Sequence, residues 1–479
     1  MLKMLRKKEI RALDKRFLMY LRSSSKYEKF VEIDGKVVMN SQMPPFGSEA
    51  FDRFLRFIPR MKKGETFPFS CNISVTNRCN FSCWHCSNWG REESEDFPLD
   101  LLISTIRQLQ DMGNCFIGLT GGEPTLRDDL EDIVEAIGTK SHTILFTNGE
   151  KLGFERAREL KKRGLFAASI SLDHYKAEIH DKLRGYEGAF DIAVKAIEAS
   201  NEAGLYTIAG AVPTKEMING GEVPIYYRFL KDIGVHEVRV LAPIPTGKLV
   251  GNREARWCGT DEEKKMWKYH KKLNRDKDFP KISEYSYLES EGMLGCMAGT
   301  YHIFIENDGT VTPCDMIPLS FGNVKEEGFA AAYQAMAGRY CVPRHECFVR
   351  AAHAQFKKGF DQEGKFPLCK ETSMEITKKI KNRRMPEFFK KLGMPQPVYE
   401  DDNPKKFRRE KLDLRGLQCP EPVWQTQEKM WEMEGGVLEI LVNEKEARDN
   451  IEKTAESEGW TSKIEPRDGG EYFLVLTNK

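Results

Sequence analysis

The sequence predicts an α/β protein with three main parts: a parallel sheet of six strand–helix units, an irregular cysteine-rich region, and a small α+β unit. Three observations predict this. Short apolar runs alternate with amphipathic segments from residue 67, cysteines accumulate after residue 250, and a second set of strands and helices follows residue 410. A length of 479 residues also suggests about three domains. The expected boundaries are an N-terminal extension at 1–66, the sheet at 67–249, the cysteine-rich region at 250–374, a basic linker at 375–409, and the last unit at 410–479.

The composition excludes several classes of protein. Lys and Arg number 74 against 73 Asp and Glu, and 40% of the residues are hydrophobic, so a disordered chain is excluded and a nucleic-acid binder is not expected. No apolar run reaches the roughly 18 residues of a membrane span, and charges interrupt the start, MLKMLRKKEIRALDKRF, too often for a signal peptide. We therefore expect a cytoplasmic protein. Because thiols stay reduced there, the twelve cysteines indicate metal or thiol chemistry.

The N-terminal extension contains a basic helical stretch, a short strand pair at 31–39 and a second helix at 51–59. The first helix either binds an acidic partner or is simply a solvated charged face.

The sheet follows from six strand patterns separated by helical periods, several of which end in Gly. This order implies parallel strands, either doubly wound or curled into a partial barrel. In both arrangements the ligand lies at the carboxyl ends of the strands. The predicted strands are 67–76, 115–120, 142–148, 167–173, 206–212 and 237–244.

Three cysteines follow the first strand directly: Cys79, Cys83 and Cys86, in CNFSCWHC. A structural zinc site requires four ligands, and there is no second cysteine pair nearby. Three thiolates suit a cubane cluster instead, because they leave one iron open to a small molecule with an amine and a carboxylate.

This CxxxCxxC motif resembles that of the radical SAM superfamily, and further motifs follow in the family's order: GGEP at 121–124, FTNG at 146–149, SISLD at 169–173, HDKLRG at 180–185, and VRVLAPIPTGK at 238–248. The resemblance covers about residues 67 to 248. It implies a partial (β/α)6 barrel, a 4Fe-4S cluster on Cys79, Cys83 and Cys86, and bound S-adenosylmethionine (SAM).

The resemblance also implies roles for the strand ends. Gly121 and Gly122 allow close approach of a ligand, and Glu123 receives the methionyl ammonium together with nearby carbonyls. Arg184 either pairs with the SAM carboxylate or forms a surface ion pair. The expected cofactor-binding residues are Gly121, Gly122, Glu123, Pro124, Asn148, Ser169, Ser171, Asp173 and Arg184.

The activity implied is that of the cofactor. One electron from the reduced cluster, supplied by a flavodoxin or ferredoxin, cleaves SAM, and a 5′-deoxyadenosyl radical takes a hydrogen atom from the substrate.

A second group of cysteines begins with Cys296 and Cys314, which bracket a hairpin pattern whose turn is NDG. With Gly309 five positions before Cys314, this resembles the entry of SPASM/Twitch auxiliary-cluster domains. Cys341 and Cys347 match part of the later cysteine run of those domains.

The SPASM/Twitch match is incomplete, because the preceding CxxC is absent and position 351 is Ala. It therefore implies one auxiliary cluster, of the 4Fe-4S type, with Cys369 as a spare or substitute ligand; a zinc site is the alternative. The implied ligands are Cys296, Cys314, Cys341 and Cys347. Cys71, Cys115 and Cys258 lack partners at metal spacing, and the first two are expected to pack as small hydrophobes.

Asp315 follows Cys314 directly. Sulfatase-maturing relatives carry an Asp here that acts as a base, so Asp315 is a catalytic candidate. The alternative is an Asp that caps the next turn.

The last unit contains LDLRGLQCPEPV, with Cys419 where a strand meets a helix. The unpaired N–H groups at a helix start stabilise a thiolate. The segment 410–479 resembles the TusA/SirA sulfur carriers, which implies a persulfide on Cys419, a link to sulfur or selenium, and a sulfurtransferase or cysteine desulfurase as partner. The alternative is a docking module with an incidental cysteine.

Together these features favour a radical SAM enzyme in which Cys419 delivers sulfur or selenium, directly or through the auxiliary cluster, to a substrate carbon. A second hypothesis is a maturase that makes thioether, carbon–carbon or oxidised side-chain products on a peptide or protein, with the carrier domain recruiting a partner. A third, a non-enzymatic sulfur or cluster carrier, is disfavoured because a carrier needs no SAM site.

Overall fold

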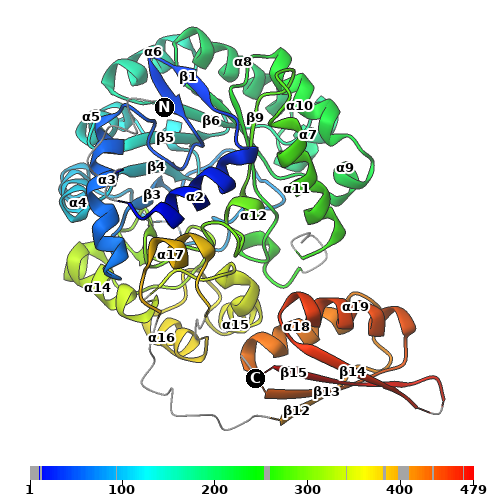
Figure 1. Cartoon of the computed structure of the whole chain (residues 1–479). Coiled ribbons are helices and arrows are strands. Elements are labelled where there is room, and N and C mark those ends of the chain that lie inside the picture. Colours follow the sequence, from blue (N-terminus) through cyan, green and yellow to red (C-terminus); the bar gives the residue numbers. More distant parts are fainter. Residues whose placement is uncertain are drawn as a thin grey trace. The chain divides into compact units, whose positions relative to one another are not determined.

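The structure is a computed structural model (Figure 1). It describes residues 10, 13–92, 94–252, 259–340, 342–380, 384–396, 409–433, 436–467 and 469–478. Cys258, Cys341 and much of the expected linker lie outside these ranges. The chain divides into two compact units, Met1–Lys378 with Arg384–Pro395, and Lys379–Arg383 with Gln396–Lys479.

The larger unit is built on one nine-stranded sheet, in the order β11-β10-β3-β4-β5-β6-β7-β8-β9. The strands from β10 to β9 are parallel, and β11 is antiparallel to β10. The six predicted strands are confirmed, with ends that differ by at most four residues. The strands are β3 (Ser70–Thr76), β4 (Phe116–Gly121), β5 (His142–Thr147), β6 (Ala167–Ser171), β7 (Tyr206–Ala211), β8 (Glu237–Val240), β9 (Lys281–Glu284), β10 (His302–Ile305) and β11 (Val311–Thr312).

The region 250–374 is not irregular, which corrects the expectation from the sequence. Its strands β9 and β10 extend the two sides of the sheet, and the predicted NDG turn joins β10 to β11, with Gly309 at φ 92°. These strands are four residues or fewer, and β9 has Lys281 and Ser283 at alternate positions. No apolar run therefore marked β9 in the sequence.

The sheet curls into a partial barrel. Arg239 on β8 places its guanidinium carbon 4.8 Å from the ring centre of Phe146 on β5, three strands away. In a flat sheet three strands span about 14 Å, which is beyond the reach of an arginine side chain. The predicted partial barrel is thus confirmed, with two parallel strands more than expected.

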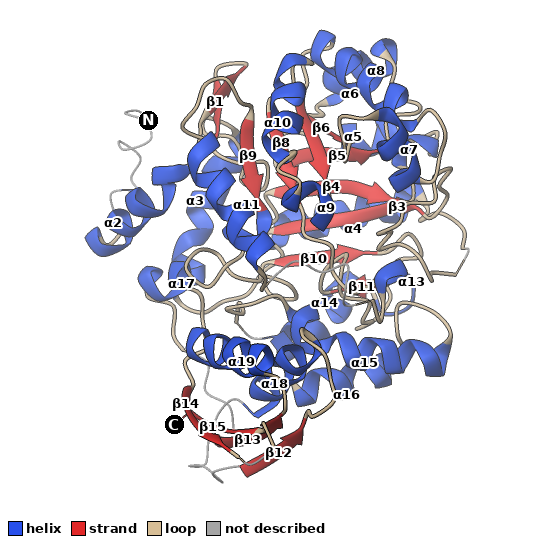
Figure 2. Cartoon of the chain, turned by 90° about the vertical axis from the view of Figure 1, so that its right-hand side faces the viewer, coloured by secondary structure: helices blue, strands red, loops and turns tan. Residues whose placement is uncertain are grey.

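Helices surround the strands on the outside (Figure 2). Gly113 and Gly164 end α4 and α6, as the sequence predicted. The elements are α4 (Leu99–Met112), α5 (Leu130–Ile137), α6 (Phe154–Arg163), α7 (Ala177–Arg184), α8 (Ala189–Glu202), α9 (Lys215–Asn219), α10 (Val223–Asp232), α11 (Asp261–Leu273), α12 (Tyr285–Leu288), α13 (Val324–Glu327), α14 (Phe329–Tyr340), α15 (Phe348–Glu363), α16 (Lys370–Lys379), and the 3-10 turns η2 (Ser25–Tyr27), η3 (Pro124–Leu126) and η4 (Gly247–Leu249).

The N-terminal extension closes the amino-terminal end of the barrel. The hairpin of β1 (Val31–Ile33) and β2 (Lys36–Val38) packs Val38 against Phe116 and Tyr206, at the starts of β4 and β7. After the hairpin, the hydroxyl of Ser41 donates to Glu237 at 2.9 Å. The barrel interior is thereby closed at this end, and its polar groups gather toward the carboxyl ends of the strands.

A buried ionic network holds this extension in place. Glu28 accepts from Lys281 Nζ at 2.8 Å and lies 3.0 Å from His270 Nε2, with all three side chains 3% exposed or less. Burial alone would raise the pKa of Glu28, but Lys281 and His270 outweigh it and lower the pKa from 4.5 to about 2.

Replacing Glu28 by Gln is expected to destabilise the fold at neutral pH, because Lys281 loses its buried counter-ion. A carboxyl group whose pKa is lowered on folding stabilises the fold above its unfolded value of 4.5, and this is lost as pH falls toward 2. Between pH 4.5 and 2, the free energy of unfolding of the wild type should thus fall by up to about 3 kcal/mol more than that of Glu28→Gln. Thermal unfolding of the cluster-free protein against pH measures this. The exposed Glu32→Gln serves as control, and equal pH profiles for wild type and Glu28→Gln would contradict the prediction.

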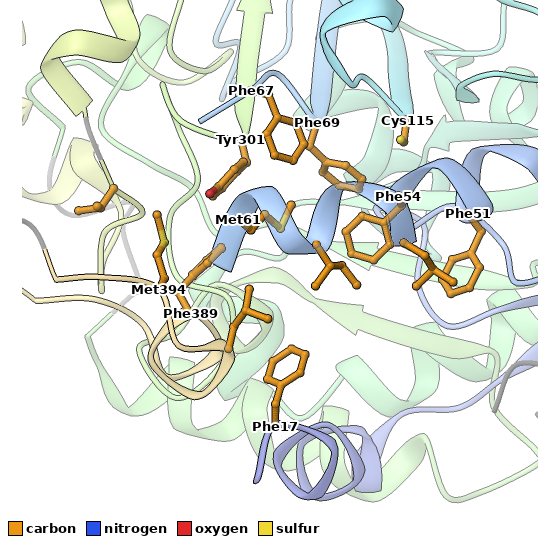
Figure 3. Packing of buried hydrophobic residues seen from close by; sticks show 14 of the residues in the cluster. Phe17, Phe51, Phe54, Met61, Phe67, Phe69, Cys115, Tyr301, Phe389 and Met394 are labelled. Atoms are coloured by element: carbon orange, nitrogen blue, oxygen red, sulfur yellow. The ribbon is translucent and has the colours of Figure 1, made fainter. Parts of the chain in front are cut away.

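One apolar cluster joins the N-terminal helices to the cysteine-rich region (Figure 3). It contains Phe54 and Met61 of α3 (Glu49–Lys62), Phe17 of α2 (Lys15–Ser24), Tyr301 before β10, and Phe389 of α17 (Glu387–Leu392). Ser48 caps α3 by accepting from Phe51 N at 3.1 Å. The cluster fixes the base of the hairpin β10–β11 against the barrel.

The smaller unit has the predicted βαβαββ order and its own apolar core, which includes Leu438, Ile451 and Leu474. Its sheet has the order β12-β13-β15-β14. The elements are β12 (Arg409–Asp413), α18 (Glu421–Met433), β13 (Gly436–Val442), α19 (Lys445–Ser457), β14 (Thr461–Pro466) and β15 (Tyr472–Asn478). In the described part of the chain, no helix has the length and apolar character that a bilayer crossing requires.

Candidate active site

The loop after β3 carries Cys79, Cys83 and Cys86 at the carboxyl end of the barrel. The three thiols lie within electrostatic range of one another, and burial raises the pKa of Cys79 to about 11 and also raises that of Cys86. Three convergent thiols on one loop fit a cubane cluster with one open iron.

Three glycines from separate segments, which follow β4, end α7 and begin η4, contact the backbone of this loop. A Cβ atom on Gly122 would lie 2.2 Å from the carbonyl oxygen of Arg78, one on Gly185 2.5 Å from that of Ser82, and one on Gly247 2.3 Å from that of Cys86. Contacts this short exclude any side chain unless the backbone moves. The backbone of the loop is thus closely packed at its start, its middle and its end.

Hydrogen bonds also hold the cysteine loop in place. Ser82 N donates to the carbonyl of Arg184 at 3.1 Å, and Asn148 Nδ2 donates to Asn80 Oδ1 at 2.8 Å. The rings of Phe81 and Tyr186 stack with centres 4.4 Å apart. The end of α7 and the end of β5 therefore position the cysteines.

Glu123 does not take the place expected for it. Its buried carboxylate accepts four hydrogen bonds, from Thr125 N (3.0 Å), Thr125 Oγ1 (2.6 Å), Thr147 Oγ1 (2.6 Å) and Asn148 N (2.6 Å). Burial raises its pKa. A carboxylate has about four acceptor sites, so these donors use its capacity and leave it to tie β4 to β5. An ammonium group at this loop would meet backbone carbonyls rather than Glu123.

Asp173 and Arg184 also differ from expectation. They form a buried ion pair with a nitrogen–oxygen distance of 2.8 Å, and Asp173 Oδ1 accepts from Val212 N at 2.9 Å. Arg184 Nη1 lies 3.7 Å from Cys83 Sγ. Arg184 is therefore buried rather than part of a surface ion pair, and it contacts one cysteine of the loop.

Ser169 and Ser171 lie on the inward face of β6, as their alternation predicted. Ser169 is buried and Ser171 half-buried. Gly210 on β7 leaves space here, since a Cβ atom there would lie 3.3 Å from Ser169 Oγ. Pro124 is buried at the start of η3.

The second cysteine group converges from three segments. Cys296 exchanges backbone hydrogen bonds with Arg344 at 2.8 and 2.9 Å, which brings it to Cys347 at the start of α15. A hydrogen bond from the Cys347 thiol lowers the pKa of Cys296 to about 6, and burial raises that of Cys314. These buried thiols face one another, which fits an iron–sulfur cluster. Among the described contacts, exposed Cys369 lies against Thr372 instead, at 3.3 Å.

Asp315 points into the interior beside the second group. It accepts from Cys314 Sγ at 3.0 Å, and ligand atoms of His302, Cys314 and Asp315 lie within 4.8 Å of one another. His302 Nδ1 in turn is 2.7 Å from Ser70 Oγ. Among the described hydrogen bonds, Asp315 accepts from no backbone N–H.

The remaining cysteines of the larger unit that the structure describes, Cys71 and Cys115, are fully buried apolar residues, which confirms their predicted packing.

In the smaller unit, Cys419 is half-buried and lies two residues before α18. Asn450 Nδ2 of α19 lies 3.4 Å from its sulfur, and Trp424 N donates to the carbonyl of Pro420 at 3.1 Å. Pro420 therefore precedes the first helical residue rather than occupying it. The thiol is accessible next to a helix start.

Several residues of the site were not predicted from the sequence. Gly185 and Gly247 lie inside motifs that were recognised, and their positive φ values of 62° and 53° are the local signal of a constrained glycine. Gly118 interrupts the apolar run of β4, because a Cβ atom there would lie 2.2 Å from Asn72 Oδ1. His302 carried no signal, since nothing in the sequence relates it to Ser70 or Asp315.

Family models match three parts of the chain: the radical SAM superfamily at residues 73–217, an iron–sulfur cluster-binding (SPASM) domain at 296–370, and the sulfurtransferase TusA at 410–478.

Named relatives match mainly the larger unit. An AdoMet-dependent heme synthase of Oleidesulfovibrio alaskensis is 27% identical over 53% of this chain and 71% of its own length. The sporulation killing factor maturation protein SkfB of Bacillus subtilis is 27% identical over 55% of this chain and 64% of its own. The crystal structure of Streptococcus suis SuiB bound to its precursor peptide SuiA superposes with a TM-score of 0.48 at 18% identity, covering 59% of this chain and 68% of SuiB.

Proposed function

Because the chain is a radical SAM enzyme with a SPASM domain and a C-terminal TusA domain, we propose that it modifies a substrate carbon with sulfur, or selenium, carried as a persulfide on Cys419. The observation that carries this proposal is the accessible thiol of Cys419 at the helix start, in contact with Asn450. A helix start and a neutral amide donor both stabilise the anionic sulfur of a persulfide.

The protein binds a 4Fe-4S cluster, SAM and an auxiliary iron–sulfur cluster. When bound, the first cluster and SAM would supply the radical that takes a hydrogen atom from the substrate. We assign the SAM-binding cluster to Cys79, Cys83 and Cys86. Asp315 is assigned as the base that accepts a proton from the substrate. The auxiliary ligands are Cys296, Cys314 and Cys347 with Cys341. Gly121, Gly122, Pro124, Asn148, Ser169 and Ser171 are assigned to the SAM side of the barrel.

The proposed sulfur insertion conserves atoms and electrons. The substrate carbon, after loss of one hydrogen atom, bonds to the anionic outer sulfur of the persulfide, and the resulting thiolate takes up a proton from solvent. The bond between the two persulfide sulfurs breaks, and Cys419 remains one electron and one proton short of a thiol. A donor of the flavodoxin or ferredoxin type supplies that electron, and a sulfurtransferase or cysteine desulfurase reloads Cys419. Delivery proceeds directly or through the auxiliary cluster.

Cysteine desulfurase with labelled cysteine is expected to load one sulfur onto Cys419. Alkylation and mass spectrometry of the intact protein should find the label in wild type and in Cys369→Ser, whose replaced thiol is also accessible, but not in Cys419→Ser. Asn450→Ala should load more slowly, because the sulfur loses its nearest donor. Labelling of Cys419→Ser at the wild-type level would contradict the assignment. With substrate, Cys419→Ala should cleave SAM without inserting sulfur.

The second candidate is a peptide or protein maturase in which the TusA domain recruits a partner. It is favoured by the similarity to SkfB, which is a maturation protein. In this case Asp315 beside His302 would deprotonate the intermediate, and Cys419→Ala would leave the product unchanged.

A cytoplasmic location also stays a prediction.

The buried pair of Arg184 and Asp173 is expected to set the reduction potential of the SAM-binding cluster. Arg184 places a charged N–H beside Cys83, which favours the more negative reduced cluster. Arg184→Gln should therefore lower the potential, and Asp173→Asn, which removes the compensating negative charge, should raise it. A redox titration followed by electron paramagnetic resonance measures both. Shifts of the same sign, at unchanged iron content, would contradict this role.

A further inference from the structure

Arg239 projects from β8 into the interior of the barrel, and only 9% of the residue is exposed. Its guanidinium carbon lies 4.8 Å from the ring centre of Phe146 and 4.2 Å from that of Tyr285. The two aromatic faces hold the planar group in one orientation.

Among the described residues, the guanidinium forms no ion pair. Its Nη1 atom is fully buried without a hydrogen bond, and within the described chain Arg239 forms no ion pair. Two other buried arginines are paired: Arg184 with Asp173, and Arg91 with Glu306, each at 2.8 Å. A buried charge without a partner destabilises a fold, so its presence indicates a ligand.

Two carboxylates lie near Arg239. Glu237, two residues away on the same face, accepts from Ser41 Oγ at 2.9 Å and from Tyr206 OH at 3.0 Å. Glu289 lies within electrostatic range of Arg239, but the two form no ion pair within the described residues. Within the described residues, neither carboxylate forms an ion pair with Arg239.

A second unpartnered donor lies beside the guanidinium. Ser283 on β9 is the register partner of Arg239, so the two side chains share the inward face, and its buried hydroxyl also lacks a hydrogen bond. The charge of Arg239 reaches His302, where it adds to the lowering of the pKa by burial, and His302 adjoins Asp315. Arg239 therefore lies within electrostatic range of His302, the neighbour of the assigned base.

We propose that Arg239, assisted by Ser283, binds a carboxylate group inside the barrel, and that the carboxylate belongs to the substrate. The guanidinium fork donates to both oxygens of a carboxylate, and the aromatic walls fix its plane. The anchor would place the substrate between the cysteine loop and Asp315. This inference rests on the proposed function, since it requires a substrate that enters the barrel.

The test compares wild type with Arg239→Met, in the reconstituted enzyme under anaerobic conditions. Removal of an unpaired buried charge is expected to raise the melting temperature. The control Arg156→Met removes an arginine paired with Glu131 at 2.8 Å and should lower it. A melting temperature of Arg239→Met below that of wild type would overturn the premise that the guanidinium is unpaired.

Two ligand arms then identify the carboxylate. Sodium propionate should raise the melting temperature of wild type above the effect of equimolar sodium chloride and of neutral propionamide, and this difference should vanish in Arg239→Met. Equilibrium dialysis with labelled SAM should give the same affinity for both proteins, within about twofold. A tenfold weaker affinity for SAM would assign the carboxylate to SAM instead of the substrate. No propionate effect and no change in SAM affinity would overturn the proposal. Neither arm requires turnover or Cys419, so failure here is distinct from failure of sulfur delivery.

Discussion

Replacing Gly122 by Ala is expected to remove the SAM-binding cluster and abolish 5′-deoxyadenosine formation. The new Cβ atom would lie 2.2 Å from the carbonyl oxygen of Arg78 and 2.6 Å from that of Asn77. Both are backbone atoms at the start of the cysteine loop, so the loop itself must move. Because Glu123 N donates to the same carbonyl of Arg78 at 2.8 Å, the displacement also breaks a hydrogen bond that closes the loop. Cys79 then leaves the position in which it faces Cys83 and Cys86.

The matched control is Gly153→Ala. Gly153 precedes α6 with φ −79°, and a Cβ atom there would meet nothing within 4 Å. This variant should retain iron content and SAM cleavage. If Gly122→Ala also retained both, the second glycine of the GGEP motif would not hold the cysteine loop in place.

Replacing Cys79, Cys83 and Cys86 together by Ala is expected to abolish 5′-deoxyadenosine formation entirely. These three thiols are the proposed ligands of the SAM-binding cluster, and no other described cysteine lies on this loop. The other three converging thiols, at Cys296, Cys314 and Cys347, lie in separate segments and should keep their cluster.

The control for this variant is Cys369→Ala, which removes an accessible thiol outside both groups. Chromatography of the reaction with dithionite and SAM measures the product. Formation of 5′-deoxyadenosine at the wild-type rate by the triple variant would place SAM cleavage elsewhere in the chain.

Much of this architecture was predictable, because local patterns dictate it. Strands such as 142–147 are short apolar runs between helices that end in Gly, and NDG fixes the hairpin between β10 and β11. The cysteine loop was predictable because its spacing is contiguous. The βαβαββ unit was predictable because each of its elements has a clear period and turn.

The remainder depends on contacts between distant residues. Strand β9 was not predicted from the sequence, because Lys281 interrupts any apolar pattern there. This lysine is buried because it pairs with Glu28, which lies in the N-terminal extension. The sequence suggested that Glu123 binds an ammonium group. Its hydrogen bonds with Thr147 and Asn148 could not be foreseen, because these two residues come from another strand of the sheet. The unpaired state of Arg239 was not predicted from the sequence, in which it is one residue of a strand motif. It follows only from the packing of the closed barrel around the side chain.

The central claim is that the chain holds two separate iron–sulfur sites, of which one cleaves SAM. Its most direct test is anaerobic iron and labile-sulfide quantitation with Mössbauer spectroscopy, in which wild type is compared with the variant that has Ala at Cys79, Cys83 and Cys86. We expect about eight irons per chain to fall to about four, with the spectrum of a remaining 4Fe-4S cluster. About four irons falling to none would contradict the claim, because Cys296, Cys314 and Cys347 would then hold no cluster.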